Sequence, residues 1–112
     1  MSILTLNEEI ILIAVCRLGG SAYGVAIRDK IAELSGKEIV YGTLYNSLEY
    51  LIRKGFVRSA KGDPTPERGG KRKTVYSITP AGKNALMNTR SLREKLWKGM
   101  PDLMMDHPGN SE

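Results

Sequence analysis

The sequence is poor in the residues on which most catalytic and metal sites depend. Its 112 residues include one cysteine, one histidine, one tryptophan and one phenylalanine. Cys16 has no second cysteine to pair with, and its place in an apolar run predicts a small buried thiol rather than a redox sensor. His107 lies near the C-terminus, and the chain shows no nucleophile and base pair and no metal-ligand spacing. We therefore expect no catalytic site, no metal and no cofactor.

Long hydrophobic segments are also missing. The longest apolar run, Ile10–Cys16, is much shorter than the roughly 20 residues that a membrane-spanning helix needs. Glu8 and Glu9 precede this run, where a secretion signal would carry Lys or Arg. These features predict a cytoplasmic protein with no membrane partner.

Charge is unevenly distributed along the chain. Residues 1–55 carry six charged side chains of each sign, whereas residues 56–100 carry eleven positive and three negative ones. Residues 101–112 carry three negative charges and no Lys or Arg. A localised basic surface attracts phosphate and gives salt-dependent binding, although a merely solvated basic face is an alternative interpretation.

The first helix is predicted from its capping signals. Thr5 and Glu8 have capping-box spacing, and Asn7 is an alternative cap, so a helix is expected over about Asn7–Leu18, before two glycines end it. Six consecutive apolar residues make this helix apolar on nearly all sides. We expect it to be central or to lie against a partner subunit, with Ile11 and Val15 in a dimer interface.

A second helix is expected over residues 22–36, with Ser21 as its cap and Gly36 as its end. Residues 38–40 are expected to form a short strand or turn. These two elements lead into the most informative segment of the chain.

That segment, YGTLYNSLEYLIRKGFV (residues 41–57), predicts an amphipathic helix followed by a strand. One face is apolar and is expected in the core: Leu44, Leu48, Leu51 and Ile52. The opposite face is polar and begins with small residues: Gly42, Asn46, Tyr50 and Arg53. A helix that enters a groove of nucleic acid needs such a face.

The residue types on the polar face match contacts to DNA. Gly42 and Thr43 allow close approach to a phosphate or a base edge, and Asn46 can pair with adenine. The hydroxyls of Tyr41 and Tyr45 are placed to reach the sugar-phosphate backbone. Tyr50 belongs to the same candidate surface, and a solvated helix face is the alternative.

The next segment predicts a β-hairpin with a basic tip. Residues 62–73 are rich in glycine, proline and basic residues, and the alternating strand TVYSIT (residues 74–79) follows. Four cations lie within six residues of this loop: Arg68, Lys71, Arg72 and Lys73. Such a tip can contact phosphates or enter a minor groove, although a solvated loop tip is also possible. The fold class predicted is mainly α with a small hairpin, a winged helix-turn-helix.

The last helix is predicted to mediate dimerisation. Thr79 and Pro80 form a cap followed by proline at the first helical position. The helix, residues 80–100, carries a seam with coiled-coil spacing: Ala85, Thr89, Leu92 and Leu96. Little of the chain remains to cover this stripe, so we expect a second copy to do so. The predicted organisation is a DNA-binding domain over 1–79, the dimerisation helix over 80–100 and a mobile tail over 101–112.

Three segments together resemble the PadR-like family of transcriptional regulators: AYGVAIRDKI, YGTLYNSLEYLIRKGFV and GGKRKTVYSITPAGK. The resemblance runs from about Leu4 to Gly82 and more loosely to Trp97. The family's Tyr-Gly-Thr-Leu-Tyr run falls on residues 41–45, and its glycine and basic cluster falls on residues 70–73, before Tyr76. What the resemblance implies is a homodimeric winged-helix repressor whose C-terminal helix contacts its partner.

The chain departs from the family in two respects. Many members have proline after the second tyrosine of the run, where this chain has Asn46. The chain also resembles the compact branch, with one C-terminal helix. In some compact relatives an aromatic residue on that helix lines a pocket at the dimer centre, and Trp97, with Met100 beside it, is the candidate here.

These observations lead to one functional hypothesis and one alternative. The hypothesis is a DNA-binding repressor that acts as a homodimer on a palindromic site in double-stranded DNA and is released by a small aromatic effector. The alternative is a winged-helix module that binds a protein partner, against which the cationic hairpin tip argues.

Overall fold

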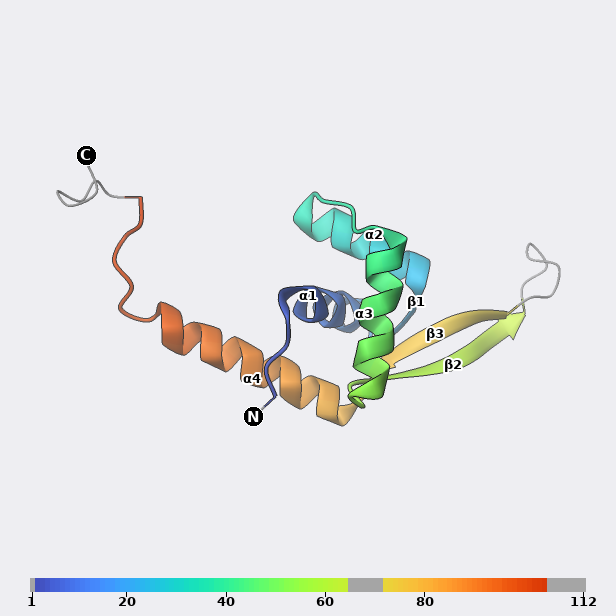
Figure 1. Ribbon diagram of the computed structural model, residues 1–112. Helices are drawn as coiled ribbons and strands as arrows, with labels where there is room; N and C mark the ends of the chain where they lie inside the picture. The colour runs from blue at the N-terminus through green and yellow to red at the C-terminus, as the bar shows by residue number, and fades with distance from the viewer. Residues whose placement is uncertain (1, 65–71, 105–112) are drawn as a thin grey trace.

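The computed structural model describes residues 2–64 and 72–104. In chain order the elements are α1 (Leu6–Arg17), β1 (Ser21–Tyr23), α2 (Gly24–Ser35), α3 (Tyr41–Arg53), β2 (Val57–Pro64), β3 (Arg72–Ile78) and α4 (Pro80–Trp97). The strands form one antiparallel sheet in the order β1-β3-β2. Figure 1 shows α1 at the centre, α2 and α3 packed around it, the β2–β3 hairpin projecting on one side and α4 on the other. This arrangement is a winged helix, as the sequence predicted.

Helix α1 lies at the centre of the fold, where its own chain encloses one side of it and buries Ile11, Leu12, Ala14 and Val15. The Thr5 hydroxyl accepts a hydrogen bond from the Glu8 backbone N–H (3.2 Å), and the Glu8 carboxylate accepts one from the Thr5 N–H (2.9 Å). The predicted capping box is therefore confirmed. Ile11 and Val15 are fully buried within the protomer, so the prediction that they contact a partner subunit was wrong.

The segment after α1 differs from its prediction. Ser21 does not cap a helix; it begins the short strand β1, which pairs antiparallel with β3, so that Ser21 lies opposite Ser77. Helix α2 therefore begins at Gly24, and it ends at Gly36, whose φ of 72° is left-handed as a glycine cap requires. No strand forms at residues 38–40.

Helix α3 contributes the middle of the hydrophobic core. Leu44, Leu48 and Leu51 are fully buried, and Ile52 packs at the edge of the same cluster, as their spacing predicted. They meet residues from the other helices and from the sheet, among them Ile27 of α2 and Ile78 of β3. Burying one side of α3 in this way leaves its other side exposed.

Helix α4 begins as predicted and packs on its own chain over its first half. Thr79 caps it, accepting a hydrogen bond from the Gly82 N–H at 3.0 Å. Ala85 and Thr89 are buried, and the Thr89 hydroxyl accepts a hydrogen bond from the Leu4 N–H at 2.9 Å. The prediction that Ala85 and Thr89 lie in the dimer interface was wrong, because α1 and the segment before it bury them within the protomer.

The second half of α4 projects from the body of the molecule (Figure 1). Leu96 and Trp97 are 66% and 60% exposed, and Leu92 is partly buried. Residues 105–112 of the predicted tail lie outside the described residues. In the described part of the chain, the helices are all too short or too polar to cross a membrane.

Cys16 is exposed near the end of α1, so the prediction of a buried thiol was wrong. The apolar run that contains it continues onto the helix face that points to solvent, which includes Ile13 and Arg17. A run of six apolar residues covers every side of a helix, and only part of α1 is enclosed.

Candidate nucleic-acid interface

The polar face of α3 is open to solvent along the whole helix. Its residues are all exposed: Gly42, Thr43, Asn46, Tyr50 and Arg53. The Arg53 guanidinium lies 5.5 Å from the Tyr50 ring centroid, within the range of a cation–π contact. Asn46, Glu49, Tyr50 and Arg53 surround a hollow of about 250 Å³ on this face. Asn46 is therefore placed to contact a molecule that lies along the outer side of α3.

The first turn of α3 is held by aromatic contacts. The Tyr41 and Tyr45 rings stack with centroids 6.0 Å apart and 13° between their planes. The Arg28 guanidinium lies 4.3 Å from the Tyr41 ring centroid, and its Nε donates a 2.8 Å hydrogen bond to the Ile39 carbonyl. These contacts fix the start of α3 against α2 and the loop between them.

Tyr45 also fits closely against α2. A Cβ atom at Gly24 would collide with the Tyr45 hydroxyl and would lie 2.9 Å from its ring carbon Cε1. The Tyr45 ring is 6.4 Å from that of Tyr76 on β3. Glycine at position 24 is therefore required for Tyr45 to lie between α2 and the sheet.

The other end of α3 is tied to α1 by an ion pair. Lys54 Nζ donates a 2.7 Å hydrogen bond to Glu8 Oε2, and the Glu8 side chain is almost completely buried. Burial alone would raise the pKa of Glu8, but hydrogen bonds from Lys54 and Thr5 and the Lys54 charge outweigh it and hold the pKa below its ordinary value. The carboxylate is therefore ionised at neutral pH, and α3 is fixed at both ends.

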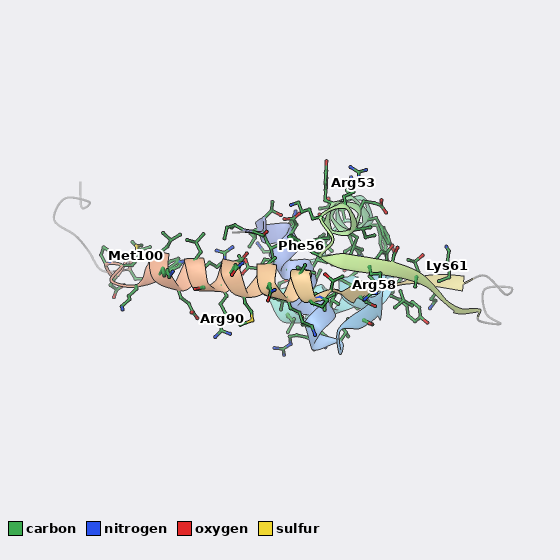
Figure 2. The ribbon with its side chains drawn as sticks, turned by 90° about the horizontal axis from the view of Figure 1, so that it is seen from below. Arg53, Phe56, Arg58, Lys61, Arg90 and Met100 are labelled. Atoms are coloured by element: carbon green, nitrogen blue, oxygen red, sulfur yellow. The ribbon has the colours of Figure 1, made fainter. Side chains whose placement is uncertain are left out.

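The hairpin carries cations beside α3. Figure 2 shows Arg58 and Lys61 one after the other along β2, toward the hairpin tip, with Arg53 on α3. Lys73 on β3 lies with its Nζ 5.2 Å from the Tyr23 ring centroid. Of the predicted tip residues, Arg68 and Lys71 lie outside the described residues, and for Arg72 only the backbone, in β3, is described.

A basic hairpin beside an exposed helix is the geometry of a DNA-binding winged helix, and comparison with known proteins agrees. The model of the transcriptional regulator PadR-like family matches residues 12–88, more than half of the chain. The chain belongs to the PadR-like family. It is a DNA-binding transcriptional regulator and not an enzyme.

Solved structures of other regulators resemble this PadR-like protein. A transcriptional regulator from Clostridium thermocellum is 28% identical, with a TM-score of 0.69 over 82% of this chain and 84% of that one. A PadR family regulator from Eggerthella lenta is 24% identical, with a TM-score of 0.67 over 80% and 76%. BpsR from Bordetella bronchiseptica is 20% identical, with a TM-score of 0.61 over 88% and 68%. No curated protein is similar enough in sequence to match.

Several residues of this PadR-like protein's surface were missed by the sequence prediction. Arg58 and Lys61 were counted in the net charge but not assigned, although a basic residue in a strand beside a recognition helix is a usable signal. Arg28 contributes by a contact to Tyr41, which is distant in sequence, so no local pattern indicates it. Tyr76 was named only as part of the family's wing motif, and its contact with Tyr45 was not predicted.

The two residues predicted to line an effector pocket lie at the far end of the PadR-like protein from the hairpin. Trp97 ends α4, and Met100 follows it at 43% exposure (Figure 2). Within residues 2–64 and 72–104, no three His, Cys, Asp or Glu side chains come together where a metal ion could bind.

Proposed function

We propose that this PadR-like protein is a repressor that binds a palindromic operator as a homodimer and leaves it when a small aromatic effector binds. The observation that carries the DNA-binding part is the exposed Asn46 face of α3 beside the cations of the hairpin. Because the core and both helix ends fix the position of α3, this face is rigid before DNA binds. Such a regulator acts where the DNA is, in the cytoplasm.

The two parts of this surface have different roles in the proposal. Asn46 and Thr43 contact base edges in the major groove, which is how sequence is distinguished. Tyr41, Tyr45 and the hairpin cations contact phosphates, which set register and affinity but not sequence. The hairpin cations include the predicted tip residues: Arg68, Lys71, Arg72 and Lys73.

Dimerisation is supported by the apolar residues that the protomer leaves uncovered at the end of α4. Leu96, Trp97 and Met100 are exposed and follow one another along the projecting helix and just past its end. Contiguous apolar surface of this kind marks an interface in soluble proteins. In a symmetric dimer, two copies of α3 would enter successive major grooves roughly 34 Å apart.

The effector site at the dimer centre depends on Trp97. The DNA binding of the relative BpsR is regulated by 6-hydroxynicotinic acid, a small aromatic compound. Trp97 is the only tryptophan, so quenching of its fluorescence by a panel of planar aromatic compounds tests the site directly. Unchanged emission across the panel would remove the effector from the proposal.

The division of roles is tested by binding measurements on two variants. Asn46→Ala should weaken binding to the preferred duplex by about 1–3 kcal/mol and relax specificity at one base pair. Lys61→Gln removes an exposed cation of β2 and should weaken binding to all duplexes similarly. It should also reduce the slope of the logarithm of the binding constant against the logarithm of the salt concentration by about one. Equal losses on preferred and random DNA for both variants would show that the roles are not divided in this way.

A further inference from the structure

Helix α3 carries one acidic residue, Glu49, on the polar face that also holds Asn46. The Glu49 side chain is exposed, and it lines the hollow of about 250 Å³ together with Asn46, Tyr50 and Arg53. In an α-helix, a residue three positions on lies about 60° around the axis and about 4.5 Å along it. A molecule that contacts Asn46 from the outer side of α3 therefore also meets the Glu49 carboxylate.

The described part of the chain does not neutralise this carboxylate. Arg53 lies four residues further along α3, the usual spacing for an ion pair, but its guanidinium lies 5.5 Å from the Tyr50 ring centroid instead. Lys61 of β2 lines a cavity of about 310 Å³ together with Glu49. Within residues 2–64 and 72–104, neither cation forms an ion pair with Glu49, and no donor forms a hydrogen bond with it.

An open carboxylate on this face opposes DNA binding in general. The other exposed residues of the face are neutral or basic: Gly42, Thr43, Asn46, Tyr50 and Arg53. DNA is a polyanion, so an acidic side chain in its groove weakens binding to every sequence that offers no hydrogen-bond donor to it. Glu49 therefore separates sequences according to whether a donor faces it.

The major-groove edges of the bases determine which donor is suitable. An ionised carboxylate accepts hydrogen bonds and donates none. Guanine presents two acceptors in this groove, and thymine presents an acceptor and a methyl group. Adenine presents an amino donor next to the acceptor N7, whereas cytosine presents its amino donor with no acceptor on the same base. Cytosine is therefore the base that a carboxylate contacts most favourably.

We propose that Glu49 is a specificity-determining residue that accepts a hydrogen bond from the amino group of one cytosine in each half-site. The inference rests on the DNA-binding function proposed above, and it adds Glu49 to the base contacts of Asn46 and Thr43. Base pairs are about 3.4 Å apart along the duplex, so the cytosine lies one or two base pairs from the base that Asn46 contacts. Glu49 acts both by binding cytosine and by rejecting the other bases.

The test measures base preference in variants of Glu49. The wild-type protein first selects a duplex from random DNA, and each position of that duplex is then changed to the other three base pairs in turn. Dissociation constants are measured for the wild type, Glu49→Gln, Glu49→Ala and Glu33→Gln. Glu33 is an exposed acid of α2 and serves as the charge control. Thermal unfolding shows that each variant is folded.

The proposal expects one position in each half-site at which the wild type prefers cytosine by roughly tenfold. Glu49→Ala should abolish the preference at that position and raise the affinity for random duplex. Glu49→Gln should also raise the affinity for random duplex but keep part of the preference, because its amide oxygen still accepts a hydrogen bond. Glu33→Gln should leave every preference unchanged.

A base analogue tests the hydrogen bond itself. Replacing that cytosine with 2-pyrimidinone, which is cytosine without the amino group, should weaken wild-type binding roughly tenfold. The same replacement should have little effect on binding by Glu49→Ala, since its hydrogen-bond acceptor is already missing.

Other results would overturn the proposal in distinguishable ways. If both Glu49 variants bind all duplexes more tightly with unchanged preferences, Glu49 repels DNA but reads no base. If the preference that depends on Glu49 is for another base, the assignment to cytosine is wrong. If neither variant differs from the wild type on any duplex, Glu49 does not face the groove, although the proposed function stands. If the wild type selects no sequence at all, the proposed function fails as well.

Discussion

Lys54, at the end of α3, donates a 2.7 Å hydrogen bond to Glu8, a buried residue of α1 that is distant in sequence. The contact joins the helix that faces DNA to the helix at the centre of the core. Glu8 also belongs to the capping box of α1, so one carboxylate both caps α1 and binds Lys54 at the end of α3.

Replacing Glu8 with Gln should therefore destabilise the fold. We expect a loss of roughly 1–2 kcal/mol in the free energy of unfolding at neutral pH, because a charged hydrogen bond is replaced by a neutral one. Urea unfolding measures it. Glu33→Gln is the control, because the Glu33 pair with Lys30 is exposed and should contribute little.

The same pair predicts a pH dependence. The pKa of Glu8 is lower in the folded protein than its ordinary value of 4.5. Its contribution to stability is therefore fully present above that value and is lost as the pH falls through the folded pKa. The difference in unfolding free energy between the wild type and Glu8→Gln should shrink over this acidic range. A difference that stays constant down to the lowest pH would contradict the assignment.

Gly24→Ala should weaken both the fold and DNA binding, because the added Cβ would displace Tyr45 from its place against α2. We expect a loss of about 1–3 kcal/mol in unfolding free energy, as for other overpacked sites. Gly42→Ala is the matched control for stability, since nothing lies within 4 Å of a Cβ at that position of α3. The control should stabilise the fold slightly, because alanine favours a helix more than glycine does. If the two substitutions had the same effect, Tyr45 would not depend on Gly24.

Thr89→Val tests the assignment of Thr89 to the protomer core. The hydroxyl accepts from the Leu4 N–H and donates to the Ala85 carbonyl, both at 2.9 Å. Its removal leaves the Leu4 N–H without this partner, so the unfolding free energy should fall by about 1–3 kcal/mol. Thr89→Ser retains the hydroxyl and should lose less. Equal losses for the two variants would show that the hydrogen bonds are unimportant.

Leu96→Ser should weaken the proposed dimer without harming the fold. Leu96 is exposed in the protomer, so its loss removes apolar area only from the interface. We expect the dimer dissociation constant to rise about tenfold, near 1.4 kcal/mol, by sedimentation equilibrium. Leu34→Ser, at an exposed leucine of α2, is the matched control. A dimer that is insensitive to both substitutions would place the interface elsewhere.

The sequence predicted the parts of the fold that local signals determine. The capping box at Thr5 and Glu8, the start of α4 at Thr79 and the buried leucines of α3 all follow from spacing within one helix. The exposure of Asn46 followed from the same projection. These features were predictable because neighbouring residues alone decide them.

The parts that were wrong depend on contacts between distant segments. Strand β1 has only three residues, and it forms by pairing with the distant strand β3. This pairing outweighs the capping preference of Ser21. Thr89 looked like an interface residue because its partner, the Leu4 N–H, lies at the opposite end of the chain. Arg93 of α4 donates a 2.9 Å hydrogen bond to the Glu9 carboxylate of α1, which is a further contact between these two helices.

The most direct test of the account is selection of bound fragments from random duplex DNA by the wild-type protein. The account predicts two inverted half-sites whose centres lie about ten base pairs apart, because two α3 helices enter successive major grooves. It also predicts that Asn46→Ala selects sites with one relaxed position in each half-site. Recovery of a single unrepeated motif, or of no motif at all, would contradict it.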